Sequence, residues 1–143
     1  MIAFHGRLAF KQYTKGKTNP WDIKVWCAAE ADSGYLLNFS IYSGKVNEPL
    51  PNGMGYHFIR QLGASFLGKY HHFVYYSYFS SVPLAEDLLR ENTYCCSTVR
   101  TNRKGFPSDY STEAGRRMQK GDVKFRQRGN LVALGWTGRT SVV

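Results

Sequence analysis

The sequence is poor in cysteine, in acidic residues and in long apolar runs. Its three cysteines are Cys27, Cys95 and Cys96, an odd set with two adjacent members, which fits neither a disulfide framework nor a Cys/His zinc site. We therefore expect a reducing compartment, the nucleus or otherwise the cytoplasm. No apolar run approaches the ~20 residues that a membrane helix needs, and polar residues interrupt the N-terminal run at 5–7. Neither a membrane partner nor a signal peptide is expected.

The 10 acidic residues are outnumbered by 19 lysines and arginines, which gives a formal net charge of +9 and a pI of about 9.6. Such an excess attracts polyanions, of which nucleic acid is the commonest inside cells. A solvated basic surface is the alternative explanation. With 43% hydrophobic and 15% aromatic residues, the 143-residue chain is expected to fold as one domain with a modest core.

Hydrophobic periodicity predicts several strands and two helices. The predicted strands cover residues 23–29, 35–41, 72–76, 94–100, 123–126 and 131–136. The first two form an antiparallel hairpin around a turn at 32–34, and the last two are joined by a turn at 128–130. Residues 101–122 form a polar, loop-rich excursion.

The first predicted helix covers about 59–66 and is ended by Gly68. The second follows a serine pair that caps it, carries Pro83 in its first turn, and places Glu86 and Asp87 near the positive end of its dipole. The order of elements is strand, strand, helix, strand, helix, strand, followed by the excursion and further strands. This α/β order predicts a mixed sheet covered by helices, of the ribonuclease H-like form, although other α/β sheets fit the pattern as well.

Four segments in collinear order resemble one family. The most informative is residues 73–89, which read FVYYSYFSSVPLAEDLL. The others are Phe4-His5-Gly6-Arg7, the stretch from Gly34-Tyr35 to Gly44-Lys45, and the stretch from Cys96 to Pro107 with Thr98-Val99-Arg100 and Asn102-Arg103-Lys104-Gly105. Together they resemble the central domain of piggyBac-type transposases.

The resemblance implies a core that cuts and joins DNA with divalent metal ions, Mg²⁺ in intact enzymes, held by three aspartates. The family's second aspartate falls on Tyr76 and its neighbouring asparagine on Ser77. A phenol is neutral at pH 7 and is a poor Mg²⁺ ligand. The first and third aspartates would fall before Met1 and after Val143. We therefore expect a single, partial and catalytically inactive ribonuclease H-like domain over 1–143, truncated at both ends, with an extra late β-hairpin and no cofactor.

The remaining signal is basic. The residues expected to contact DNA phosphates, without sequence preference, are Lys11, Arg100, Arg103, Lys104, Arg116, Arg117, Lys124 and Arg126. Tyr75, Tyr76, Tyr78 and Phe79 are expected to pack in the core or at its rim rather than to stack on bases, and the cysteines to be buried in strands. Two alternatives are open: a protein-interaction module that forms a homodimer or pairs with an intact relative, and, against the missing aspartates, an active transposase subunit.

Overall fold

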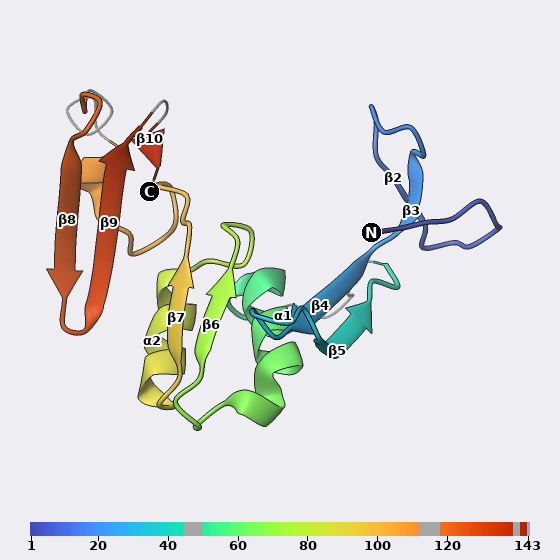
Figure 1. Ribbon diagram of the computed structural model, residues 1–143, viewed down its shortest axis with the longest axis horizontal. Coiled ribbons are helices and arrows are strands. Elements are labelled where there is room, and N and C mark those ends of the chain that lie inside the picture. Colours follow the sequence, from blue (N-terminus) through green and yellow to red (C-terminus); the bar gives the residue numbers. More distant parts are fainter. Residues whose placement is uncertain (45–49, 112–117, 139–140, 143) are drawn as a thin grey trace.

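The computed structural model describes residues 1–44, 50–111, 118–138 and 141–142, and shows four small sheets with two α-helices (Figure 1). The strands are β1 (Ile2–Ala3), β2 (Gln12–Tyr13), β3 (Trp21–Ile23), β4 (Val25–Ala29), β5 (Leu36–Ile41), β6 (His72–Tyr75), β7 (Tyr94–Ser97), β8 (Val123–Arg128), β9 (Leu131–Thr137) and β10 (Ser141–Val142). The helices are α1 (Gly53–Gly63) and α2 (Val82–Arg90), with short 3-10 turns at Ala64–Phe66 and Ser108–Tyr110. The prediction of an α/β chain is confirmed at this level.

The predicted first hairpin is present as β4 and β5, which pair antiparallel from Val25 opposite Ile41 to Ala29 opposite Leu36. The strand predicted over 23–29 is interrupted at Lys24, because β3 belongs to another sheet, with the order β1-β3-β2. The hairpin lies against α1 through Trp26 of β4, whose ring centre is 5.1 Å from that of Phe58, and through the polar side of β5, where the Asn38 amide donates to the Leu62 carbonyl at 3.2 Å. The apolar alternate residues of β5 therefore face away from the helix.

Helix α1 begins at Gly53, six residues before the apolar spacing predicted it, because Asn52 and Gly53 both have positive φ and turn the chain into the helix. Its end agrees better with the prediction: the 3-10 turn follows, and Gly68 has a φ of 74°. Gly63 packs close under β6, where an added Cβ would meet the Phe73 ring, so a larger residue there would require that ring to move.

The predicted cap of α2 is confirmed. Ser81 is the N-cap, its hydroxyl accepts from the Leu84 amide at 3.3 Å, and Pro83 lies in the first turn. Leu84 and Leu88 are fully buried and form the core with Tyr75 of β6. This helix connects β6 to β7, which pair in parallel from His72 opposite Tyr94 to Tyr75 opposite Ser97.

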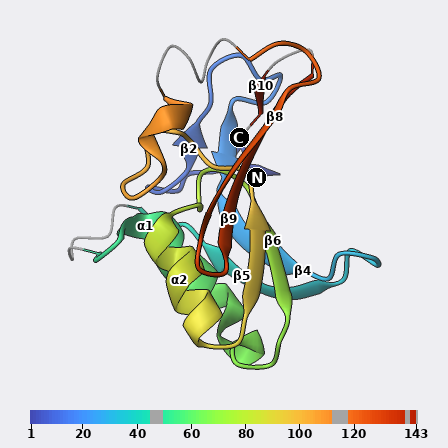
Figure 2. The same cartoon turned by 90° about the vertical axis from the view of Figure 1, so that its left-hand side faces the viewer.

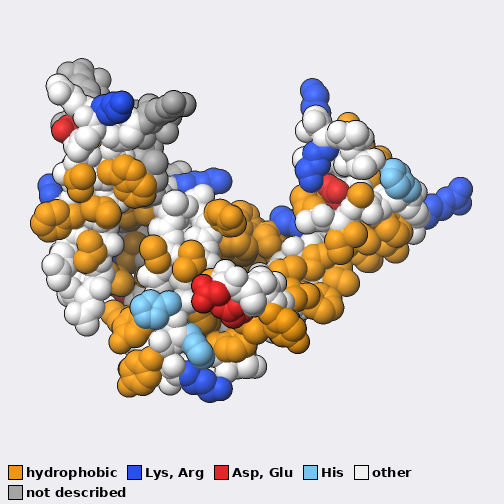
Figure 3. Space-filling model, in the orientation of Figure 1, with side chains coloured by type: hydrophobic (Ala, Val, Ile, Leu, Met, Phe, Trp, Pro, Cys, Tyr) orange, Lys and Arg blue, Asp and Glu red, His pale blue; other side chains and the backbone are white. Residues whose placement is uncertain are grey.

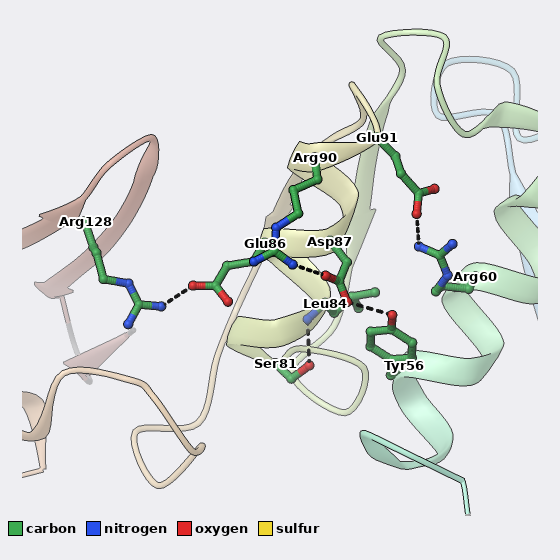
Figure 4. A network of polar contacts seen from close by, with 9 residues as sticks. All are labelled: Tyr56, Arg60, Ser81, Leu84, Glu86, Asp87, Arg90, Glu91 and Arg128. Carbon is green, nitrogen blue, oxygen red and sulfur yellow. Dashed lines mark hydrogen bonds and ion pairs between the residues drawn. The ribbon is translucent and has the colours of Figure 1, made fainter.

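Glu86 and Asp87 do not act at the helix N-terminus as expected, since both lie beyond the first turn. Asp87 instead accepts from the Tyr56 hydroxyl of α1 at 2.8 Å, and Glu91 pairs with Arg60 of α1 at 2.8 Å (Figure 4). Glu86 pairs with Arg128 of the late hairpin. These contacts join α1, α2 and the late hairpin.

The single mixed sheet that we expected is divided. The pairs β4-β5 and β6-β7 are separate two-stranded sheets, with the helices on one side of them (Figure 2). The late hairpin is confirmed as β8-β9, with β10 added to β9. No helix in the described residues is long and apolar enough to cross a membrane.

The cysteines are less buried than expected. Cys27 and Cys96 are exposed, and only Cys95 is partly buried. Cys95 lies on the side of β7 that packs against the core, whereas Cys96, its neighbour on the strand, points to the opposite side. The prediction that the cysteines lie in strands is confirmed. The prediction that they are buried is wrong for Cys27 and Cys96, because one side of each sheet is uncovered.

Candidate nucleic-acid interface

The carboxyl ends of β6 and β7 bring the most informative sequence positions together. Because the two strands are parallel, the residues that follow them meet at one edge. Tyr76 and Ser77 follow β6 directly, and Arg100 comes three residues after β7. We call this group, with Arg103 and Lys104, the strand-end site.

Tyr75 and Tyr76 are neighbours with opposite environments. Tyr75 is 8% exposed in the core, and burial raises the pKa of its phenol far above the usual value. Tyr76 points to the other side of the strand and is 81% exposed. The packing expected for Tyr76 is therefore wrong, and its ring is available to solvent.

Arg103 holds the two strand-end loops together. Its guanidinium donates to the carbonyl oxygens of Ser77 and Tyr78, both at 3.1 Å, while its buried Nε has no partner in the described structure. The side chain also lines a hollow of about 220 Å³ beside the start of α1. Arg103 is thus fixed in place with part of its charge turned inward, which gives it a positioning role in the loop.

Arg100 and Lys104 remain the accessible cations of this loop. Both are exposed, and their side chains make no hydrogen bond or ion pair with any described residue. The backbone bond from the Arg103 amide to the Arg100 carbonyl, at 3.0 Å, forms the turn that carries them. Arg100 and Lys104 are thus held on a hydrogen-bonded turn at the same sheet edge as the exposed Tyr76. Exposed cations of this kind can contact a phosphate backbone.

The other predicted basic residues are not gathered at this site. Lys124 and Arg126 lie on β8, and both pair with Asp109, at 3.0 Å and 2.7 Å. Hydrogen bonding from Lys124, aided by the charge of Arg126, lowers the pKa of Asp109. Lys11 lies in the N-terminal region with its ammonium 4.5 Å from the centre of the Trp21 ring. Arg116 and Arg117 fall outside the described residues.

The sequence placed Ser80 before α2 but did not indicate its role in this region. Its side chain is buried, and its hydroxyl contacts the Thr98 carbonyl at 2.5 Å and the Tyr76 carbonyl at 3.3 Å. It therefore ties the end of β6 to the end of β7. The adjacent serines 80 and 81 predicted a helix cap in the sequence. Their spacing did not reveal that only Ser81 caps α2, whereas Ser80 binds the carbonyls of Thr98 and Tyr76.

The donor set at the strand ends does not fit Mg²⁺. This ion requires hard oxygen ligands, above all carboxylates, and the side chains here are a phenol, a serine and cations. Within the described residues, no group of three or more His, Cys, Asp or Glu side chains could hold a metal ion. The chemistry available to this edge is binding of an anion through Arg100 and Lys104.

Comparison with known proteins gives a consistent picture. The family model described as Transposase IS4 matches residues 1–143. The human PiggyBac transposable element-derived protein 3 is 28% identical over 144 residues, which cover 92% of this chain and 23% of that protein. The human Chimeric ERCC6-PGBD3 protein matches at the same identity, with 13% of its length covered.

A solved structure, the piggyBac transposase synaptic complex with hairpin DNA determined by cryo-EM, superposes with a TM-score of 0.83 at 25% identity. The match covers 98% of this chain and 30% of that one. The chain thus spans less than a third of the length of each of these proteins.

Proposed function

Because this chain belongs to the Transposase IS4 family and resembles piggyBac-derived proteins, we propose that it is a transposase-derived protein that does not cut DNA and that binds DNA without sequence preference. The strand-end site carries the proposal. It presents Tyr76 where the family resemblance places a metal-binding aspartate, and it carries two exposed cations, Arg100 and Lys104, in the loop that follows the neighbouring strand β7. The likeness to a transposase solved with hairpin DNA supports nucleic acid as the ligand class.

The pairs β4-β5 and β6-β7 are, in this proposal, the two parts of a ribonuclease H-like sheet. Their common side is covered by α1 and α2, and the crossover from β6 through α2 to the parallel β7 is the unit from which such sheets are built. A nuclear location belongs to the same proposal, because that is where DNA is available to bind.

The salt dependence of DNA binding tests the proposal. Fluorescence anisotropy with a labelled random-sequence duplex should show binding that weakens linearly in a plot of log affinity against log salt. Each phosphate contact contributes about one to the slope, so Arg100→Ala combined with Lys104→Ala should reduce the slope by about two.

Lys69→Ala is the matched control for that experiment. Lys69 is exposed and precedes β6, so it lies at the amino end of the strand, away from the strand-end site. Its removal should leave the slope unchanged. Absence of binding at low salt, or an equal effect of the control, contradicts the proposal.

Loss of cleavage has its own test. The chain should not nick supercoiled plasmid DNA in Mg²⁺, and Tyr76→Asp should not create this activity, because one carboxylate does not complete a two-metal site. Gel analysis of nicked and closed plasmid measures both. Nicking by the unchanged chain that chelation abolishes contradicts inactivity.

A second function, protein interaction, is favoured by a specific observation: apolar side chains of the two central sheets, such as Phe39 of β5 and Val74 of β6, are 56% and 77% exposed. Binding to DNA and to protein would use different surfaces, since the basic turn lies at the strand ends and the apolar residues lie along the strands.

A further inference from the structure

Strand β8 carries a row of cations that the strand-end site does not use. Lys124, Arg126 and Arg128 are alternate residues, so they lie on one side of the strand, and we call them the β8 row. A strand rises about 3.4 Å per residue, which spaces the members of the row by roughly 7 Å along the strand. Strand β8 is also the edge of its sheet (Figure 1). A straight row of like charges at an edge suits a linear polyanion, such as the phosphate backbone of DNA.

Two carboxylates from other elements bind the β8 row. One oxygen of Asp109, Oδ2, lies 3.0 Å from the Lys124 ammonium and 2.7 Å from the Arg126 guanidinium. Glu86 of α2 pairs with Arg128 at the end of the strand (Figure 4). Each cation of the row is therefore paired with an acid of the same chain.

Buried neighbours place both carboxylates. Asp109 precedes Tyr110, which is 4% exposed and whose hydroxyl lies within hydrogen-bond distance of carbonyls on β8 and β9. Glu86 belongs to α2, which contributes two fully buried leucines to the core. The acids thus stay next to the row when their ion pairs open, because other contacts hold the elements that carry them.

The members of the row differ in how accessible they are. Lys124 is 22% exposed, and its ammonium also donates to the Asp109 carbonyl at 3.0 Å and lies 4.9 Å from the centre of the Tyr110 ring. It therefore serves the attachment of the hairpin. Arg126 and Arg128 are 54% and 62% exposed, so an external anion can reach both guanidinium groups.

We propose that Arg126 and Arg128 form a second DNA-binding surface, which Asp109 and Glu86 block in the unchanged chain. The ligand is the phosphate backbone, so this inference rests on the proposed DNA binding and adds its regulation. Ion pairs at an exposed surface are weak and open readily. A phosphate that replaced either carboxylate would, however, leave that acid unpaired next to a polyanion, and their repulsion opposes the exchange. The two arginines therefore add little to DNA binding until the acids are removed or neutralised.

Removal of the two acids tests the proposal by fluorescence anisotropy with a labelled random-sequence duplex. Asp109→Asn combined with Glu86→Gln should steepen the slope of log affinity against log salt by about two, because two arginines become available to phosphates. Each single variant should steepen the slope by about one. Affinity at low salt should rise at least several-fold in the double variant, and circular dichroism checks that each variant is folded.

The matched control is Glu91→Gln combined with Asp32→Asn. It changes the net charge by the same amount and also opens an ion pair, that of Glu91 with Arg60 of α1 at 2.8 Å, away from β8. Asp32 lies in the exposed turn of the first hairpin. The control should leave the slope as it is in the unchanged chain, which separates opening of the β8 row from a general gain of positive charge.

The same two arginines should matter differently in the two backgrounds. Arg126→Ala combined with Arg128→Ala should return the slope of the Asp109→Asn and Glu86→Gln variant to that of the unchanged chain, a change of about two. In the unchanged chain the same pair of alanines should have a much smaller effect. This arm needs no removal of the acids, so it tests the proposal even if that variant fails to fold.

Three results overturn the proposal: a slope that does not steepen when the acids are removed, an equal change in the control, or alanines that cost about two in the unchanged chain. Failure of the strand-end site is a separate result. Arg100→Ala combined with Lys104→Ala would then leave the slope unaffected, while removal of Asp109 and Glu86 would still steepen it.

Discussion

Trp26 attaches the first hairpin to the rest of the molecule. Its ring stacks on Tyr78 at 5.3 Å between centres, packs edge-on against Phe79 at 5.2 Å, and has the Lys24 ammonium 4.1 Å from its own centre. Aromatic pairs contribute about 0.5–1.5 kcal/mol each beyond the area they bury. One side chain thus joins β4 to the segment that follows β6, which no pattern within either segment indicates.

The turn of the same hairpin depends on Glu30. Its carboxylate accepts from the Ser33 hydroxyl and from the amides of Asp32 and Ser33, and these bonds lower its pKa to about 2. Because the folded-state pKa lies below the ordinary value of about 4.3, the turn is stabilised above that pH and loses this contribution as the pH falls toward 2.

Ser33→Ala should raise the pKa of Glu30 toward its ordinary value, because the Ser33 hydroxyl is the largest cause of the shift. NMR titration of the Glu30 side-chain carbonyl measures the change. Ser43→Ala, at an exposed serine beyond the hairpin, is the control and should leave the titration as it is. An unchanged pKa in Ser33→Ala would show that the backbone amides alone hold the carboxylate.

At the level of elements, α2 is the best-defined part of the chain. Its cap, its proline and its two buried leucines all agree with one another and with the sequence pattern. The neighbouring α1 has no side-chain cap at Asn52 and is held instead by contacts with α2 and the first hairpin. The two helices therefore differ in how much their own sequence stabilises them.

Ser81→Ala should destabilise the chain by about 1 kcal/mol, since it removes the acceptor for the Leu84 amide. Urea denaturation followed by circular dichroism measures the free energy of unfolding. Ser65→Ala, at an exposed serine in the 3-10 turn after α1, should cost less. Equal losses in the two variants would argue that the Ser81 cap contributes nothing.

At the scale of the whole molecule, the late hairpin is joined to the body by polar contacts. Tyr110 is 4% exposed, and its hydroxyl lies 3.1 Å and 2.8 Å from the carbonyls of Lys124 on β8 and Ala133 on β9. Asp109 binds the cations of β8, and Glu86 of α2 binds Arg128. The basic side of the hairpin thus faces the body, and its apolar residues, such as Phe125 and Val132, are exposed.

The attachment of the hairpin should depend on pH. The pKa of Asp109 is lowered in the folded state by its bonds with Lys124 and Arg126, so the contact is present above the ordinary value of about 3.9 and is lost as the pH falls through the lowered pKa. Hydrogen exchange of the β8 and β9 amides, corrected for intrinsic rates, should accelerate in that range.

Asp109→Asn should accelerate hydrogen exchange of the β8 and β9 amides at neutral pH, as acid does in the unchanged chain. Glu86→Gln makes the same test for the contact with Arg128. Exchange in β8 and β9 that does not accelerate in Asp109→Asn at pH 7 would show that the contacts of Tyr110 and Glu86 hold the hairpin without Asp109.

The sequence by itself determined the local elements and the family. Alternation predicted the first hairpin, serine and proline placed the start of α2, the turn at 128–130 joined the late strands, and four collinear segments indicated the transposase relationship. Each of these depends on residues close together in the chain, where spacing fixes which side chains share a side of an element.

The tertiary structure alone decided which of those sides are covered. Strand β5 packs through its polar side, and Tyr76 points outward while Tyr75 is buried. Lys124 and Arg126 are paired with Asp109, and Cys27 and Cys96 are exposed. Burial and pairing depend on neighbours that are distant in sequence, and periodicity within one segment carries no information about them. For that reason the sequence indicated only that the protein is basic. The fold showed that Lys124 and Arg126 are paired with Asp109, whereas Arg100 and Lys104 are exposed.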